Sequence, residues 1–114
     1  MSYMSYSCIT RKQCNVIYRA FKLGQLVPPK DCRGKVKSPG FIYRYECRSY
    51  YEGFRLHDDE KLLNAQLNAI SEIVGLIISG KFEEAQKLFN CEDELFNSKY
   101  IPEGVSPKKF WKAV

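Results

Sequence analysis

The segment Asp59–Ser79 constrains the fold most, because it predicts one long helix that is apolar on more than one side. His57 and the acidic residues after it are typical of a helix start, where negative charge interacts favourably with the helix dipole. A helix with so wide an apolar surface has to be covered on two sides. Its apolar residues are Leu62, Leu63, Ala65, Leu67, Ala69, Ile70, Ile73, Val74, Ile77 and Ile78.

A second helix is expected directly after Gly80, which is placed to end the first one. Lys81–Phe89 has apolar residues at helical spacing, and the pattern allows the helix to continue through Leu95 and Phe96. The connection is so short that the two helices should pack as an antiparallel hairpin. The side chains expected to face inward are Phe82, Ala85, Leu88 and Phe89.

This hairpin also predicts self-association. A chain of 114 residues has a thin core, and the hairpin carries more large aliphatic side chains than we expect it to bury alone. We therefore expect a homo-oligomer that assembles through Ile70, Ile73, Val74 and Ile77.

The first helix is expected at Arg11–Leu23. Thr10 fits the N-cap position with Gln13 completing a capping box, and Gly24 fits the position after the C-terminus. Its apolar face comprises Cys14, Ile17, Tyr18 and Phe21. Its polar stripe comprises Arg11, Asn15, Arg19 and Lys22.

Between this helix and the hairpin, the sequence predicts a basic, Pro- and Gly-rich loop over residues 28–40 and a strand over Phe41–Tyr51. Phe54–Leu56 is expected to pair back onto that strand after a turn. The expected fold class is therefore α+β: an N-terminal helix and a small antiparallel sheet, followed by a C-terminal helical hairpin. We expect a single domain over 1–114, with a basic aromatic half (1–56), the hairpin (57–98) and a tail (99–114) that docks Phe110 and Trp111 on the helices.

Positive charge and aromatic residues are concentrated in the first half of the sequence. Residues 1–55 carry eleven Lys and Arg against three Asp and Glu, a net charge of +8, and residues 56–114 carry seven against ten, a net charge of −3. All six arginines and seven of the eight tyrosines lie in that first part. The asymmetry indicates an anionic partner with flat rings.

The main binding candidates are Arg44, Arg48 and Arg55, which are interleaved with aromatic residues. Arginine forks match phosphate oxygens, and aromatic faces stack on nucleobases. The same pattern is also typical of a strand with core aromatics on one face and solvated arginines on the other. Arg11 and Arg19, on the polar stripe of the first helix, form a second candidate set for phosphate contacts.

The sequence contains no phosphate-binding Walker loop, dinucleotide fingerprint or nucleophile elbow. Acid-base chemistry would have to use His57 or the acidic cluster Asp58, Asp59 and Glu60, which is explained better as the start of a helix, and a Cys–His pair such as Cys47 with His57 is an alternative for nucleophilic chemistry. Because a nucleophile also needs an orienting group and an oxyanion site, we expect a protein that is not an enzyme and needs no cofactor. The five cysteines lack the short paired spacing of zinc ligands, so no metal site is predicted.

The N-terminal residues lack the features of a secretory signal, and the run Ile73–Ile78 is too short to span a bilayer, which predicts a cytoplasmic protein with no membrane partner.

The small size, the Met-Ser start, the free cysteines and the lack of a catalytic motif resemble bacteriophage host-takeover and anti-defence proteins. More narrowly, the outline is similar to the phage anti-Thoeris sponge family, whose members sequester cyclic-nucleotide signals in the host bacterial cytosol. The resemblance implies assembly through two C-terminal helices, and a pocket with a stacking aromatic, a helix asparagine and arginines. The corresponding positions are Phe54, Asn64 and Arg55. Ile9–Gly24 is similar to the family's N-terminal helix, which in some members holds a second site for a cyclic oligonucleotide.

These observations predict a non-catalytic viral protein for immune evasion that binds and sequesters a nucleotide-like signal, possessing no metal or cofactor of its own. The first alternative is a basic protein that binds nucleic acid or inhibits a host nuclease effector such as a CRISPR complex. The second alternative is a helical interaction adaptor, for which the apolar helix residues and not the arginines would be essential. The salt dependence of binding distinguishes these alternatives. Binding to a nucleic-acid strand weakens steeply as the salt concentration rises, because it releases counterions, whereas binding in a closed pocket depends on salt less.

Overall fold

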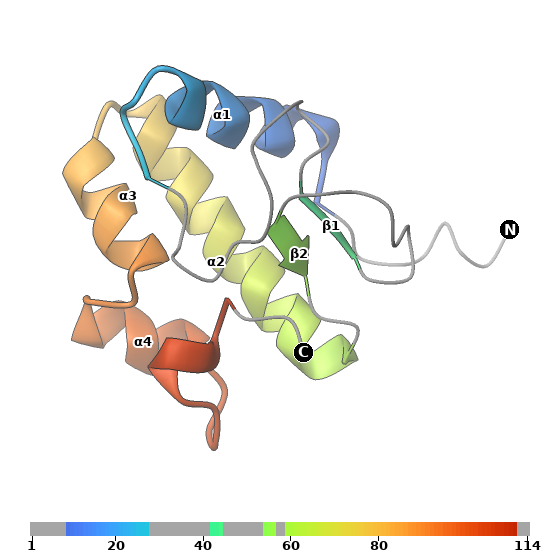
Figure 1. Ribbon diagram of the computed structural model, residues 1–114. Coiled ribbons are helices and arrows are strands. Elements are labelled where there is room, and N and C mark those ends of the chain that lie inside the picture. The colour runs from blue at the N-terminus through green and yellow to red at the C-terminus, as the bar shows by residue number, and fades with distance from the viewer. Residues whose placement is uncertain (1–8, 28–41, 45–53, 57–58, 112–114) are drawn as a thin grey trace, which may run out of the picture.

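The protein is built from α-helices around one long central helix. In the computed structural model, residues 9–27, 42–44, 54–56 and 59–111 are described. They form α1 (Arg11–Lys22), α2 (Glu60–Ile78), α3 (Phe82–Phe89), α4 (Glu94–Tyr100) and a short 3-10 helix, η4 (Pro107–Lys109). Figure 1 shows α2 running diagonally through the molecule, with α1 above it, α3 beside it and α4 below.

The apolar residues of α2 supply the centre of the core. Leu63, Ala69, Ile70 and Ile73 are at most 1% exposed, and one polar residue, Gln66, is buried among them. The helices α1, α3 and α4 all contact α2, so its wide apolar surface is covered from several sides within a single chain. The prediction that this helix must be covered on two sides is confirmed.

The residues expected to hold an oligomer together lie inside this core. Ile70 and Ile73 are 1% and 0% exposed, and Val74 and Ile77 are 7% and 8% exposed. The hairpin does not have to bury them alone, because α1, α4 and the C-terminal tail also pack against the same core. An interface through these four side chains would require the core to open, so the argument for an oligomer at this place does not hold.

The residues that cap α1 and end α1 and α2 are those that the sequence predicted. The Thr10 hydroxyl accepts from the Gln13 amide at 3.1 Å, and the Gln13 side chain accepts from the Thr10 amide at 3.0 Å, which is the predicted capping box. Gly24 and Gly80 follow the C-caps of α1 and α2 with φ of +74° and +78°. Glycine adopts this left-handed conformation without the steric cost that a side chain brings, so both residues end their helices as predicted.

The hairpin of α2 and α3 is confirmed, but α3 does not continue through Leu95. The chain leaves α3 at Asn90, and Cys91 takes a left-handed conformation with φ of +56°. Asp93 then starts α4 by accepting a hydrogen bond from the Phe96 amide at 3.1 Å. The predicted continuation failed because a cysteine took the turn position that glycine usually holds, which gave no signal in the sequence.

The expected α+β fold with an antiparallel sheet is wrong. The described part is predominantly helical, and its extended structure is limited to β1 (Ile42–Arg44) and β2 (Phe54–Leu56), three residues each, which pair in parallel. Alternating residues predict a strand face, but they specify neither its length nor the direction of its partner. The rest of the predicted strand, residues 45–51, and the basic loop 28–40 lie outside the described residues.

The C-terminal tail docks on the helices, as predicted. Phe110 is 0% and Trp111 is 6% exposed, and the ring of Trp111 lies 5.4 Å from the ring of Phe89 between centroids. The buried Gln66 side chain donates a hydrogen bond to the Phe110 carbonyl at 2.9 Å. The Trp111 indole N–H points to the Leu88 carbonyl at 3.4 Å, so the tail is held by polar as well as apolar contacts.

By length and composition alone, α2 could cross a membrane: 19 residues with a mean hydropathy of 1.2 over its most apolar 18-residue window. The expected absence of a membrane partner rested on the shorter run Ile73–Ile78, and the whole helix is longer than that run. In the described structure its large aliphatic side chains, except the exposed Ile78, belong to the protein core or pack against it, which is the usual place of such a helix in a folded domain.

Replacing Gln66 by leucine should destabilise the protein although the volume is nearly kept. The Phe110 carbonyl would lose its donor inside the core, and an unsatisfied buried polar group costs about 1–3 kcal/mol. We expect a lower free energy of unfolding in urea, measured by tryptophan fluorescence. Asn68→Leu, at an exposed position of the same helix, is the control and should change stability by less than about 0.5 kcal/mol; equal effects of both variants would contradict the role given to Gln66.

Candidate functional site

The structure describes only part of the arginine-aromatic set. Arg44 lies in β1, and Phe54 and Arg55 lie in β2, where the backbone register places Phe54 opposite Ile42 and Arg55 opposite Tyr43. The two short strands that carry these residues are therefore neighbours, as a shared site would require. Arg48 lies outside the described residues, as do Cys47 and His57.

The remaining predicted site residues lie on exposed helix surfaces. Asn64 is exposed on the first half of α2, and Arg11 and Arg19 are exposed on α1. Arg19 lines a pocket on α1, and among the described residues neither Asn64 nor Arg11 lines it. The structure therefore brings Arg19 together with other predicted residues of the polar stripe, while Asn64 belongs to a different helix surface.

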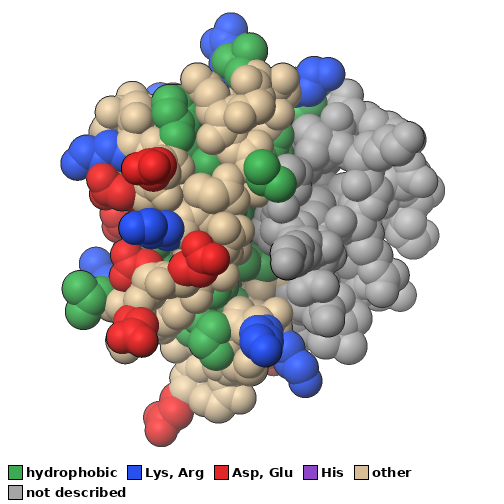
Figure 2. All heavy atoms as spheres, turned by 60° about the vertical axis from the view of Figure 1, so that its left-hand side comes forward, with side chains coloured by type: hydrophobic (Ala, Val, Ile, Leu, Met, Phe, Trp, Pro, Cys, Tyr) green, Lys and Arg blue, Asp and Glu red, His purple; other side chains and the backbone are tan. Residues whose placement is uncertain are grey.

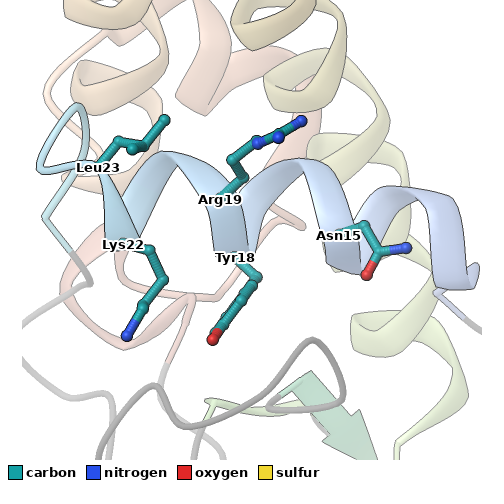
Figure 3. Close-up of a pocket in the computed structure, with 5 residues that line it drawn as sticks. All are labelled: Asn15, Tyr18, Arg19, Lys22 and Leu23. Atoms are coloured by element: carbon teal, nitrogen blue, oxygen red, sulfur yellow. The ribbon is translucent and has the colours of Figure 1, made fainter.

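This concavity, the α1 pocket, is the larger of the two described hollows. It has a volume of about 480 Å³, and all its described lining residues come from α1. They are Asn15, Tyr18, Arg19, Lys22 and Leu23. In Figure 3, Tyr18 and Lys22 project together on one side of the helix, while Arg19 and Leu23 project on the other and Asn15 lies towards the N-terminal end. The phenol ring and one cation thus lie on one side of this stretch of α1 and the second cation on the other, with the Asn15 amide about one turn away.

The outward orientation of the α1 pocket is fixed by the opposite face of the helix. Cys14, Ile17 and Ala20 are buried on that face, and α1 packs on α2. The Gln13 side chain also donates to the Ser71 hydroxyl of α2 at 3.2 Å. Rotation of α1 about its axis would break this packing, so the polar stripe stays on the surface.

The sequence of α1 contains four cations, Arg11, Lys12, Arg19 and Lys22, and no Asp or Glu. Arg19 and Lys22 lie in the last turn, where positive charge also interacts favourably with the helix dipole. Their placement therefore has a structural benefit besides any ligand. The absence of a carboxylate on the same helix nevertheless leaves the guanidinium and ammonium groups without an intrahelical counter-charge, which suits the capture of an anion.

The described cysteines are not arranged as nucleophiles. Burial raises the pKa of the Cys14 thiol to about 11. Burial also raises the pKa of Cys91 to about 11, although a hydrogen bond with Trp111 acts in the opposite direction. A nucleophilic cysteine needs a lowered pKa. Within the described residues, no group of three or more His, Cys, Asp or Glu side chains is placed to hold a metal ion.

A second hollow, which the sequence did not reveal, lies between α2, α3 and α4; we call it the α4 groove. It has a volume of about 240 Å³. Its apolar lining comprises Leu76, Leu88, Leu95 and Phe96, and its carboxylates belong to Glu72, Glu84 and Asp93. Figure 2 looks onto the side of the molecule where α3 lies and shows several acidic side chains there, with basic and hydrophobic side chains among them. The break between α3 and α4 creates this groove, so a prediction of one continuous helix could not find it.

Comparison with known proteins adds no relative: no family model, curated protein or solved structure matches the chain. The resemblance to the anti-Thoeris sponges therefore remains an expectation from the sequence.

The raised thiol pKa values predict a loss of stability at alkaline pH. Because the folded state holds these protons more tightly than the unfolded state, the contribution to stability is complete below pH 9.0, the ordinary thiol value, and is lost as the pH rises to about 11. The urea midpoint of the wild type should fall more steeply over this range than that of Cys14→Ala, which lacks one titrating thiol. Parallel curves for the two proteins would show that the Cys14 thiol does not contribute.

Proposed function

We propose that the protein is a non-catalytic binding protein that captures an anionic, nucleotide-like ligand on the outward face of α1. The observation that carries the proposal is the α1 pocket, in which Arg19, Lys22, Asn15 and Tyr18 line one concavity. The cations supply partners for phosphate oxygens, and the amide of Asn15 offers both a donor and acceptors for a base or sugar.

The size of the pocket favours a small ligand. Its volume of about 480 Å³ lies within the roughly 300–1,000 Å³ that is typical of small-molecule sites. The Tyr18 side chain lines the pocket and is partly buried against the core, and stacking of a nucleobase on the exposed part of an aromatic ring contributes at most about 1–3 kcal/mol. A nucleotide therefore uses both the charge and the aromatic surface of the pocket.

The biological role that fits such a ligand is sequestration of a cyclic-nucleotide immune signal by a phage-type anti-defence protein in the cytosol of a bacterial host. Tight binding without turnover lowers the concentration of free signal. This role is supported by the similarity of Ile9–Gly24 to the N-terminal helix of the anti-Thoeris sponges and by the basic charge of the first 55 residues. The arginines of β1 and β2 and Arg48 are the second candidate contact set.

Binding should be measured by isothermal titration with a panel of cyclic mononucleotides and cyclic dinucleotides. Replacing Arg19 and Lys22 together by alanine should weaken binding about a hundredfold or more, because each of the two charge-assisted hydrogen bonds contributes about 1.5–3 kcal/mol. The control is Lys61→Ala, which removes a cation from an exposed position of α2 outside the pocket and should leave affinity unchanged.

The triple variant Arg44→Ala, Arg48→Ala, Arg55→Ala tests the second contact set in the same assay. If the α1 variant binds with full affinity and the triple variant loses binding, the ligand does not bind at α1 but at the arginines of the second contact set. No binding of any cyclic nucleotide by the wild type, together with binding of single-stranded nucleic acid that weakens steeply with salt, would favour the alternative of a nucleic-acid-binding protein.

A further inference from the structure

The α4 groove has the properties of a docking surface for a segment of protein. Leu88 and Phe96 are buried at 4% and 5% exposure, while Leu95 is 85% exposed. The floor of the groove is therefore covered by the protein's own side chains, and Leu95 is the apolar side chain that a partner would contact at its edge. With a volume of about 240 Å³, the groove is smaller than the roughly 300 Å³ at which small-molecule sites begin, so one or two side chains of a partner fit it better than a whole ligand.

The carboxylates of the α4 groove are held in place before any partner arrives. The Tyr100 hydroxyl donates to a Glu72 carboxylate oxygen at 3.0 Å, and an oxygen of Asp93 accepts from the Phe96 amide at 3.1 Å. Glu84 adds a third negative charge against one cation, Lys99, whose ammonium lies 5.2 Å from the centroid of the Tyr100 ring. The excess of negative charge selects a cationic partner.

The same chain presents a surface of complementary chemistry. The exposed side of α1 carries Arg19 and Lys22, and the C-cap residue Leu23, which follows them, is 64% exposed. Val27, which is 66% exposed, lies further along the chain, where its backbone is hydrogen-bonded to the Gln86 side chain of α3. Cations beside an exposed leucine match carboxylates beside the exposed Leu95. Of the four large hydrophobic residues that are most exposed in the described part, Leu23 and Leu95 belong to these two surfaces, and Val27 and Ile78 belong to neither.

We propose that the α4 groove of one molecule binds the end of α1 around Lys22 and Leu23 of a second copy. A molecule cannot satisfy its own groove in this way, because α1 is packed on α2 and lies away from α4 (Figure 1). The contact joins two different surfaces: made once between neighbouring molecules it is heterologous and builds chains or closed rings, and exchanged reciprocally it closes a two-fold dimer. This interface replaces the one expected through the buried isoleucines of α2.

This inference does not rest on nucleotide binding, since the α4 groove contains none of the residues of the α1 pocket. Ligand binding and association are nevertheless connected, because Lys22 and Leu23 line the α1 pocket and also form the proposed contact. A ligand bound on α1 should therefore compete with association.

The test uses two variants of the full chain that each lose one side of the contact. Leu95→Lys places a positive charge in the α4 groove, and Lys22→Glu reverses a charge at the end of α1; both positions are exposed. In sedimentation velocity at low salt, the mass of the wild type should rise with concentration, and each variant alone should sediment as a monomer. The mixed variants retain one intact groove and one intact α1 end, so the mixture should form a 1:1 dimer and nothing larger.

The matched control is Ile78→Lys, which adds the same charge at an exposed apolar residue outside the groove and should associate as the wild type does. Raising the salt to roughly 0.5 M should weaken wild-type association, because screening shortens the reach of the charges. A wild type that stays monomeric at all concentrations would overturn the proposal. So would association that Leu95→Lys leaves intact, or a mixture of the two variants that remains monomeric.

Discussion

Burial of the apolar surface of α2 is the constraint on which the rest of the structure depends. Four other segments, α1, α3, α4 and the C-terminal tail, belong to the core built on this helix. Burial of each large aliphatic side chain contributes about 1.5–3 kcal/mol, so no other element of the described structure contributes as much. The polar contact between Gln66 and the Phe110 carbonyl fixes where the tail lies within this apolar environment.

Because most of the apolar surface of α2 is buried in the core, both hollows are formed largely by the helices that cover it, with Glu72 and Leu76 of α2 contributing to the α4 groove. The outer side of α1 is cationic and contains the α1 pocket, and the outer edge of α3 and α4 is acidic and contains the α4 groove. In the described part of the chain, positive and negative charge thus lie on two separate surfaces. The proposed association between neighbouring molecules and the proposed binding of a small anion both use this arrangement.

The sequence predicted those features that depend on short-range patterns. Thr10 with Gln13, and Gly24 and Gly80, defined the ends of α1 and α2, since caps and left-handed turns need particular residues. The fold class failed because alternating residues around Tyr43 indicate a strand without indicating its partner. The α4 groove was missed because Cys91 adopts a turn conformation that its residue type does not announce. Of the candidate site, the sequence predicted the stripe containing Arg19, but it could not show which neighbours shape a pocket around it.

The most direct test of this account is a nucleotide titration followed by amide chemical shifts in two-dimensional NMR spectra. The account predicts shifts concentrated on the amides of Asn15 to Leu23, with the core amides of α2 around Ile73 unchanged, because the ligand sits on the outer side of a helix whose inner side stays packed. Shifts confined to α3 and α4, or spread through α2, would contradict it, since they would place the ligand in the acidic groove or require the core to open.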